Sequence, residues 1–269
     1  MTDITPSPTD HMLVADLSKR FGDYQALSDI NMRIGRGRIV IIIGGSGAGK
    51  TTLMKILIGL DRPTSGNILI DGVDIAQLKR AELRQIRRKF GMVFQYSALL
   101  DSMNVFENLA FPLREHTNLR GKEIAKRVSE KLEALNLGAI ESRMPSELSG
   151  GMKKRVGLAR ALMMEPEIIM YDEPTSGLDP LSARLVDEMI VDTRNRFGVT
   201  SVVISHDMAG ALRVGDYIYV LSKGTIAAHG TPAELVATQT GIAKEFFDAS
   251  GIAAELLIPG GEARIEGSS

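Results

Sequence analysis

The sequence contains no cysteine, and no apolar run approaches the ~20 residues that a membrane-spanning helix requires. The absence of cysteine excludes disulfides, thiolate catalysis and cysteine-bound zinc, and it is compatible with a cytosolic protein. The N-terminus is polar and lacks the basic start and apolar core of a signal peptide. We therefore expect a soluble chain. If it acts at a membrane, another chain spans that membrane.

The net charge of the chain is also close to zero. The 269 residues include 32 Lys and Arg against 33 Asp and Glu, so the formal net charge is −1. This balance gives no general electrostatic attraction to nucleic acid, and we expect no nucleic-acid partner. The length suits one large domain with a substantial core, and the content of hydrophobic and charged residues is that of an ordinary globular protein.

The most informative stretch is a β-branched apolar run, 39–43, followed by glycines, a lysine and two threonines. This order matches G-x-x-x-x-G-K-[ST], the phosphate-binding P-loop between a buried strand and a helix. Backbone N–H groups can surround phosphate oxygens where no side chain obstructs them, and the helix N-terminus favours negative charge. A plain glycine-rich turn is the simpler interpretation, but the flanking strand and helix disfavour it.

The P-loop motif assigns specific roles to two side chains. Lys50 is predicted to reach the β- and γ-phosphates of a nucleotide, and the Thr51 hydroxyl is predicted to ligate Mg²⁺. The predicted nucleotide-binding residues of this stretch are Gly44, Gly45, Ser46, Gly47, Ala48, Gly49, Lys50, Thr51 and Thr52.

A second buried strand, starting at Ile168, ends in two carboxylates, Asp172 and Glu173. Ligands bind at this end of the strands in open α/β sheets. Asp172 is predicted to hold Mg²⁺ through water, and Glu173 to take the proton from an attacking water. Alone, the pair would more simply cap a helix, but the upstream P-loop favours catalysis. Together the two strands predict an α/β fold built on the parallel sheet of a P-loop NTPase.

Three further residues are candidates for the same site. Gln95 and His206 each follow an apolar run, where a loop amide or a structural histidine would be the default interpretation. Both occupy positions that would reach a γ-phosphate, which favours a catalytic role, and Gln95 is also a candidate Mg²⁺ ligand. Phe21 either stacks on a nucleotide base or fills the core at a strand end, and the pattern leaves both interpretations open.

The remaining pattern predicts the organisation of the chain. Residues 96–165 are expected to form an all-helical insertion within a domain spanning 1–240, followed by a tail at 241–269 in which Ile242 to Ile258 pack on this or a neighbouring subunit. The basic helix expected at 81–90 presents a solvated face, with a membrane or partner contact as the alternative. Expected strands are 12–17, 27–34, 168–174, 200–204, 217–221 and 225–228, and other expected helices are 104–116, 121–137, 153–164 and 179–196.

These motifs occur in the order found in ATP-binding-cassette (ABC) ATPases. Leu148-Ser-Gly-Gly151 precedes Asp172-Glu-Pro174, and Thr175-Ser-Gly-Leu-Asp179 and Ser205-His206 follow, so that the resemblance covers roughly 12–235. It implies a RecA-like parallel core with an antiparallel β subdomain and an inserted helical subdomain. It also implies a homodimer that hydrolyses ATP with Mg²⁺.

The resemblance further implies individual roles. Phe21 would stack on adenine, Gln95 would link Mg²⁺ and water to the partner protein, and His206 would be the switch histidine. Ser149, Gly150 and Gly151 would form the signature motif that binds the γ-phosphate of ATP held by the other subunit. Asp179 would be the aspartate that crosses the dimer interface.

A narrower similarity is to the ATPase subunits of Mla/MCE-associated lipid transporters, through Phe94–Asn108, Phe111–His116 and Leu148–Leu162. It implies phospholipid transport between bacterial envelope membranes, with the chain peripheral on the cytoplasmic face of the inner membrane. The implied partners are an MlaE-like membrane permease, expected to dock at Tyr96 to Met103, and indirectly an MCE-type lipid-binding protein. The alternatives are an ABC ATPase of the lipoprotein-release or cell-division type and a soluble ABC ATPase without a transport role.

The sequence departs from the usual ABC pattern at three positions. Met152 replaces the usual glutamine after the signature, Gly45 stands where proline is common, and Tyr171 replaces an aliphatic residue before Asp172. None of these changes removes a phosphate ligand, although Met152 has no hydrogen-bond donor.

Overall fold

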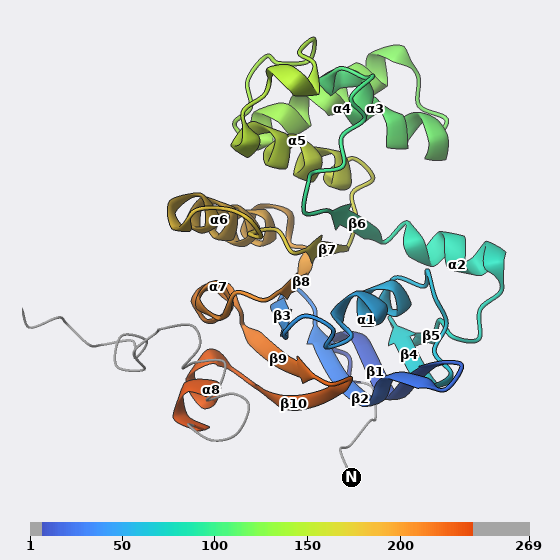
Figure 1. The fold of residues 1–269 in the computed structure, drawn as a ribbon. Helices are drawn as coiled ribbons and strands as arrows, with labels where there is room; N and C mark the ends of the chain where they lie inside the picture. Colours follow the sequence, from blue (N-terminus) through green and yellow to red (C-terminus); the bar gives the residue numbers. More distant parts are fainter. Residues whose placement is uncertain (1–6, 239–269) are drawn as a thin grey trace, which may run out of the picture.

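The computed structural model describes residues 7–238, which form two β-sheets and a separate group of helices (Figure 1). The packing predicted for 242–258 lies outside the described residues. Within residues 7–238, no helix has both the length and the apolar character needed to span a membrane.

The larger sheet has six strands in the order β10-β9-β3-β8-β7-β6. All neighbouring strands are parallel except β10, which pairs antiparallel with β9. The strands are β3 (Ile39–Ile43), β6 (Phe90–Val93), β7 (Ile168–Asp172), β8 (Thr200–Ser205), β9 (Tyr217–Ser222) and β10 (Thr225–Gly230). The predicted parallel core is therefore confirmed.

Strand β3 is buried on both faces, as its uninterrupted apolar sequence predicts. Val40 and Ile42 pack into a core shared with α1 (Lys50–Leu57) and the smaller sheet. Ile39, Ile41 and Ile43 point to the opposite core, which is covered by α6 (Pro180–Phe197), α7 (Met208–Val214) and α8 (Pro232–Thr238). Because both faces are apolar, a one-residue slip would exchange the side chains between the two cores, so the close packing of each core fixes the register of β3.

The smaller, antiparallel sheet has the order β2-β1-β4-β5. Its strands are β1 (Asp10–Phe21), β2 (Tyr24–Gly35), β4 (Ser65–Ile70) and β5 (Val73–Asp74). The hairpin of β1 and β2 extends beyond the predicted strands and places Phe21 opposite Tyr24 at its tip. Phe21 is 50% exposed, so the interpretation of Phe21 as a core residue is wrong.

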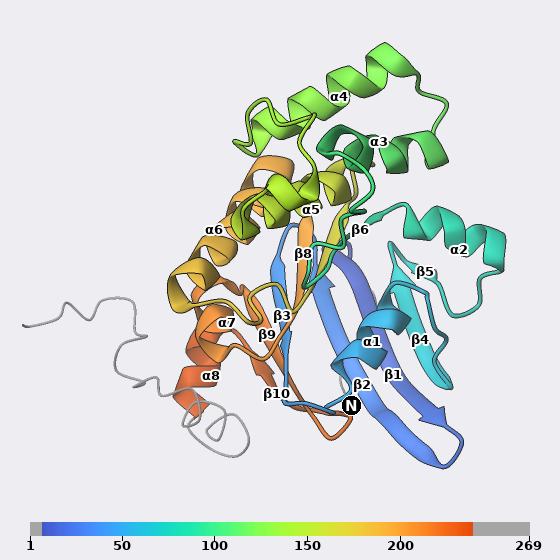
Figure 2. The ribbon, with the colours of Figure 1, turned by 45° about the horizontal axis from the view of Figure 1, so that its top comes forward.

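Between β6 and β7 lie only helices, grouped at one end of the molecule in both views (Figures 1 and 2). They have their own apolar core, to which Leu109, Val128 and Val156 contribute. These helices are α3 (Val105–His116), α4 (Gly121–Ala134), the short 3₁₀ helix η1 (Pro145–Glu147) and α5 (Gly150–Leu162).

Three helix boundaries differ from the sequence predictions by three residues. Helix α4 ends at Ala134 and not at Leu137. Helix α2 (Arg80–Arg87) ends before Phe90, which instead begins β6 and pairs with Ile168. Helix α5 begins three residues earlier than expected, because the Ser149 side chain caps it by accepting a hydrogen bond from the Met152 N–H.

A buried amide shapes the segment that leads from β6 into α3. The Asn108 side chain is fully buried. It accepts a hydrogen bond from the Leu100 N–H at 2.8 Å and donates to the carbonyls of Leu100, Met103 and Asn104 at 2.9–3.1 Å. These bonds satisfy backbone groups of a loop that forms no regular structure.

We predict that Asn108→Leu lowers the free energy of unfolding by about 2 kcal/mol or more, because it leaves the Leu100 N–H and the Met103 carbonyl without these partners. Urea unfolding measures the change. The control is Asn195→Leu, on the exposed face of α6, which should change stability by no more than about 0.5 kcal/mol. Equal unfolding midpoints for the two variants would contradict the assigned role of Asn108.

Candidate functional site

Residues 44–49 connect β3 to α1 as the P-loop pattern requires. Gly49 has a φ of 103°, and a Cβ atom there would lie 2.8 Å from Leu27 Cδ2, so packing of the protein itself demands glycine. At Gly45 a Cβ atom would meet nothing within 4 Å. A Cβ atom at Gly44 would clash with the Leu221 carbonyl, so the loop packs against the protein at both ends. Between these ends, at Gly45 and Gly47, it faces open space where a phosphate group has room to approach the backbone.

Lys50 lies at the first position of α1 and reaches back over the loop. Its Nζ atom donates hydrogen bonds to the carbonyls of Gly44 at 2.7 Å and Gly45 at 3.2 Å. The same atom lies 3.4 Å from Glu173 Oε1. The ammonium group thus joins the P-loop to the Glu173 carboxylate at the end of β7.

Glu173 and His206 form a close pair, with 2.6 Å between Glu173 Oε2 and His206 Nδ1. Glu173 has a φ of 47°, a left-handed conformation that costs a non-glycine residue about 1–3 kcal/mol, and its N–H donates to the Ile204 carbonyl at 2.9 Å. The structure therefore brings together Lys50, Glu173 and His206, three residues selected from separate parts of the sequence.

Asp172, the last residue of β7, lies next to this group. Burial raises the pKa of its carboxyl group, and the charge of Glu173 raises it further, while Lys50 acts in the opposite direction. A partly buried carboxylate with too little positive charge around it is a suitable ligand for a cation. Together with the exposed Thr51 hydroxyl in the first turn of α1, it offers the oxygen donors that Mg²⁺ prefers.

Gln95 is held by residues of two other segments. The side-chain Nε2 atom donates to Ser176 Oγ at 3.1 Å and to Tyr96 Oη at 3.3 Å. The main-chain carbonyl of Gln95 accepts a hydrogen bond from Lys154 Nζ at 3.3 Å. Neither Ser176 nor Lys154 was singled out from the sequence. Ser176 lies within the Thr175–Asp179 run that carries the ABC resemblance, whereas no pattern in the sequence indicates the contact of Lys154.

The signature residues and Asp179 lie at helix N-termini. Ser149 caps α5 with Gly150 and Gly151 exposed beside it, and Asp179 caps α6. The hydroxyl and backbone N–H of Ser182 hold the pKa of Asp179 below its usual value. Within residues 7–238, these capping groups make no hydrogen bond or ion pair with Lys50, Glu173 or His206.

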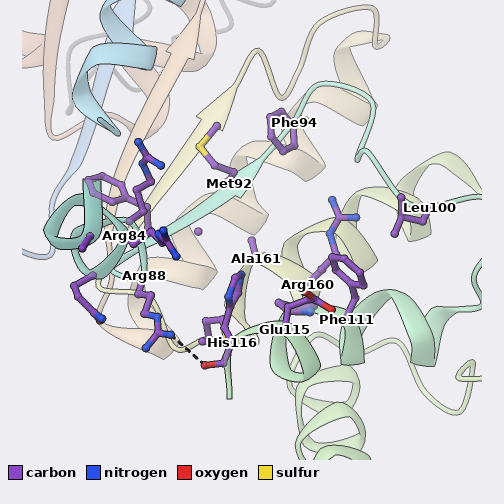
Figure 3. Close-up of a pocket in the computed structure, with 17 residues that line it drawn as sticks. Arg84, Arg88, Met92, Phe94, Leu100, Phe111, Glu115, His116, Arg160 and Ala161 are labelled. Carbon is purple, nitrogen blue, oxygen red and sulfur yellow. Dashed lines mark hydrogen bonds between the residues drawn. The ribbon is translucent and has the colours of Figure 1, made fainter. Parts of the chain in front are cut away.

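A separate groove of about 950 Å³ lies between α2, β6, α3 and α5. In Figure 3, Arg84 and Arg88 approach it from one side, and Phe111 and Arg160 from the other. Of residues 96–103, only Leu100 lines the groove. Tyr96 is 85% exposed and lies outside that lining.

Comparison with known proteins places this site in a family. A family profile described as "ABC transporter" matches residues 27–176. The solved cassette cbiO1 of Clostridium perfringens, described as part of an ABC transporter complex, superposes with a TM-score of 0.79 at 30% identity. It covers 91% of this chain and 100% of its own. A dimeric ATP-binding cassette bound to ADP and Pi gives a TM-score of 0.72 at 34% identity, over 82% of this chain and 98% of its own. The chain therefore belongs to the ABC transporter family, binds nucleotide and is an ATPase of the ABC type.

Within this family, the chain is similar to proteins of two descriptions. It is 41% identical, over 84% of its length and 86% of the relative, to the intermembrane phospholipid transport system ATP-binding protein MlaF of Haemophilus influenzae. The Escherichia coli K12 protein of that name is also 41% identical, over 87% of both chains. The probable ribonucleotide transport ATP-binding protein mkl of Mycobacterium leprae is 40% identical, over 87% of this chain and 68% of its own.

We predict that Asp172→Asn raises the melting temperature of the nucleotide-free protein by ~2–4 °C at pH 7.5. Because the pKa of Asp172 is higher in the folded than in the unfolded chain, its ionised form destabilises the fold, and this penalty disappears as pH falls through the raised pKa. Thermal unfolding without Mg²⁺ should show a difference that shrinks as pH is lowered from 7.5 toward the ordinary Asp pKa of about 4. Asp192→Asn, on the exposed face of α6, is the control, and an equal rise in that variant would refute this origin.

Proposed function

We propose that the chain hydrolyses ATP to drive phospholipid transport between bacterial envelope membranes, as the subunit on the cytoplasmic face of the inner membrane. The single observation that carries the chemistry is the convergence of Lys50, Glu173 and His206 at one edge of the parallel sheet. The phospholipid substrate is supported by two 41%-identical relatives named for that transport. Ribonucleotide transport is the second candidate, because relatives at 40% identity carry that name.

ATP binds along the P-loop, with its phosphates against 44–52 and its adenine on Phe21. The open space at Gly45 and the donors of Lys50 suit the phosphates, and Phe21 offers an exposed ring at the tip of the β1–β2 hairpin. Thr51, Asp172 and Gln95 would hold Mg²⁺, directly or through water, and the oxygen chemistry of all three fits that ion. When bound, Mg²⁺ supplies positive charge that neutralises the phosphates during transfer.

Glu173 acts as the general base. Its two oxygens face Lys50 and His206. A γ-phosphate competes for both of these donors, which leaves the carboxylate able to accept the proton of the attacking water. His206 is exposed and donates a hydrogen bond to the γ-phosphate. When His206 turns from Glu173 to the phosphate, nucleotide binding frees the Glu173 carboxylate to act as the base.

The complete site requires a second copy of the chain. Ser149, Gly150 and Gly151 are exposed and offer N–H groups at the start of α5, a favourable position for the γ-phosphate of ATP bound to the partner. Asp179 is exposed at the start of α6 and contacts the partner across the interface. One solved relative is described as a dimeric cassette, which supports this arrangement.

The domain that carries these functions spans 1–240, with 96–165 as its helical subdomain and 241–269 as its tail. An MlaE-like membrane permease inserts a cytoplasmic segment into the groove between α2, α3 and α5 (Figure 3). Leu100 and Phe111 give this groove exposed apolar anchors, and Tyr96, which is exposed outside the groove lining, is a further candidate contact. An MCE-type lipid-binding protein joins the assembly through the permease.

We predict that Lys50→Ala abolishes productive ATP binding, whereas Glu173→Gln retains binding and loses ~10²–10⁴-fold in kcat. Because closure is driven by bound ATP, Glu173→Gln should accumulate as a dimer with ATP and Mg²⁺, while Lys50→Ala remains monomeric. Steady-state hydrolysis and light scattering measure the two effects. Near-normal turnover by Glu173→Gln would remove this residue from the role of base.

We predict that Leu100→Ala with Phe111→Ala leaves the ATPase activity of the isolated chain within about twofold of wild type but weakens permease binding at least ~30-fold. Truncation of central anchors at an interface costs ~2 kcal/mol or more. The matched control, Leu60→Ala with Val73→Ala, removes two exposed apolar side chains outside the groove and should bind normally.

Transport by the reconstituted complex separates the substrate candidates. Vesicles that contain the chain with its permease should transfer labelled phospholipid in an ATP-dependent way, and the Leu100→Ala, Phe111→Ala variant should not. ATP-dependent uptake of a ribonucleotide without lipid transfer would favour the second candidate and overturn the first.

A further inference from the structure

Lys154 in α5 is a half-buried cation whose hydrogen bonds go only to carbonyl groups within residues 7–238. Its Nζ atom donates to the Pro174 carbonyl at 2.5 Å and to the Gln95 carbonyl at 3.3 Å. Burial lowers the pKa of this amine, and among the described residues it has no carboxylate partner to offset that effect. An ammonium group taken from water in this way is costly unless its hydrogen bonds compensate. The hydrogen bonds to the two carbonyls therefore hold the Lys154 ammonium in place and fix these carbonyls against α5.

The same side of α5 holds the rest of the loop that begins at Gln95. Arg160 donates to the carbonyls of Ala98 at 2.7 Å and Ser97 at 3.2 Å. Between the two cations, Gly157 allows close approach, since a Cβ atom there would lie 3.1 Å from Ser97 Cβ. Residues 154, 157 and 160 are spaced three apart and therefore lie on one face of α5, so about two turns of this helix contact the loop.

The anchored segments contain strained backbone. Ser97 and Ala98 have φ values of 60° and 45°, and Glu173, directly before Pro174, has a φ of 47°. Left-handed conformations of non-glycine residues persist only where the surroundings impose them. Lys154 and Arg160 bind carbonyls at or next to each of these positions. These contacts with α5 therefore help to hold the left-handed conformations in place.

We propose that Lys154 is a positioning residue for ATP hydrolysis, whose ammonium ties the loop carrying Gln95 and the turn carrying Glu173 to one point on α5. Because α5 begins at the signature residues Gly150 and Gly151, a shift of this helix displaces both loops together. The proposal rests on the roles assigned above to Gln95 and Glu173. It explains why a lysine with no acidic partner lies half-buried at this point of the structure.

The test is Lys154→Met in the full-length chain, which keeps the length of the side chain and removes its charge and donors. We expect kcat to fall at least ~10-fold, because small displacements of catalytic groups are that costly, while KM and Kd for ATP stay within about twofold. Lys154→Arg, which retains donors, should recover part of kcat. Lys153→Met is the matched control, since Lys153 makes no hydrogen bond or ion pair through its side chain within the described residues, and it should behave as wild type.

Hydrogen exchange without nucleotide gives a second readout that needs no turnover. Amides in 95–98 and 173–176 should exchange ~10-fold faster in Lys154→Met and remain unchanged in Lys153→Met. If kcat and exchange match those of the control, or if only the melting temperature falls, the proposal is overturned. A large loss of ATP affinity would instead assign Lys154 to binding. Absence of hydrolysis by the wild-type chain would contradict the proposed catalytic roles, whereas exchange would still decide whether Lys154 anchors both segments.

Discussion

The parallel register of β3, β8 and β7 is the constraint on which the site depends. Ile43 lies opposite Ser205, and Asp172 lies opposite Ile204, so the three strands end at one edge of the sheet. The P-loop, the turn at Glu173 and the segment at His206 all leave the sheet from that edge. A slip of one residue in any of these pairings would turn its side chains to the other face, where a core of different shape would not fit them.

Interactions between charged and polar groups hold the side chains that the sheet brings together. The chain is nearly neutral overall, yet the site pairs Lys50 and His206 with Glu173 and leaves the Asp172 carboxylate only partly compensated. In the proposed function, a nucleotide enters a site whose polar and charged groups already hold one another in place, and it changes their partners instead of ordering them anew. Such preorganised dipoles and charges are the largest contribution to many enzymatic rate enhancements.

The sequence predicts a strand accurately where an apolar run is followed directly by the residues of a recognisable motif. The strands at 39–43, 168–172 and 200–205 match their predictions to within two residues, because each is an apolar run bounded by glycine or polar residues. The helical spacing of Phe90 from Leu83 and Ile86 predicts a helix there, but pairing with Ile168 places Phe90 in the sheet. The polar tip of the β1–β2 hairpin has no hydrophobic alternation, so the sequence does not predict the full length of its strands. Contacts of Ser176 and Lys154 depend on tertiary structure alone, and the roles proposed for Ser149 and Asp179 require a second subunit.

The strand that supports the P-loop also makes the chain vulnerable while it is being synthesised. Residues 39–43 are uncharged and entirely apolar, and both of their pairing partners, at 201–205 and 217–220, lie about 160 residues or more further along the chain. At typical synthesis rates the segment waits on the order of ten seconds before either neighbour emerges. An exposed apolar β-branched segment of this kind is prone to cross-β association. Shielding of the nascent chain by chaperones, and the charges of Arg36 and Arg38 just upstream, would protect the strand until its partners are made.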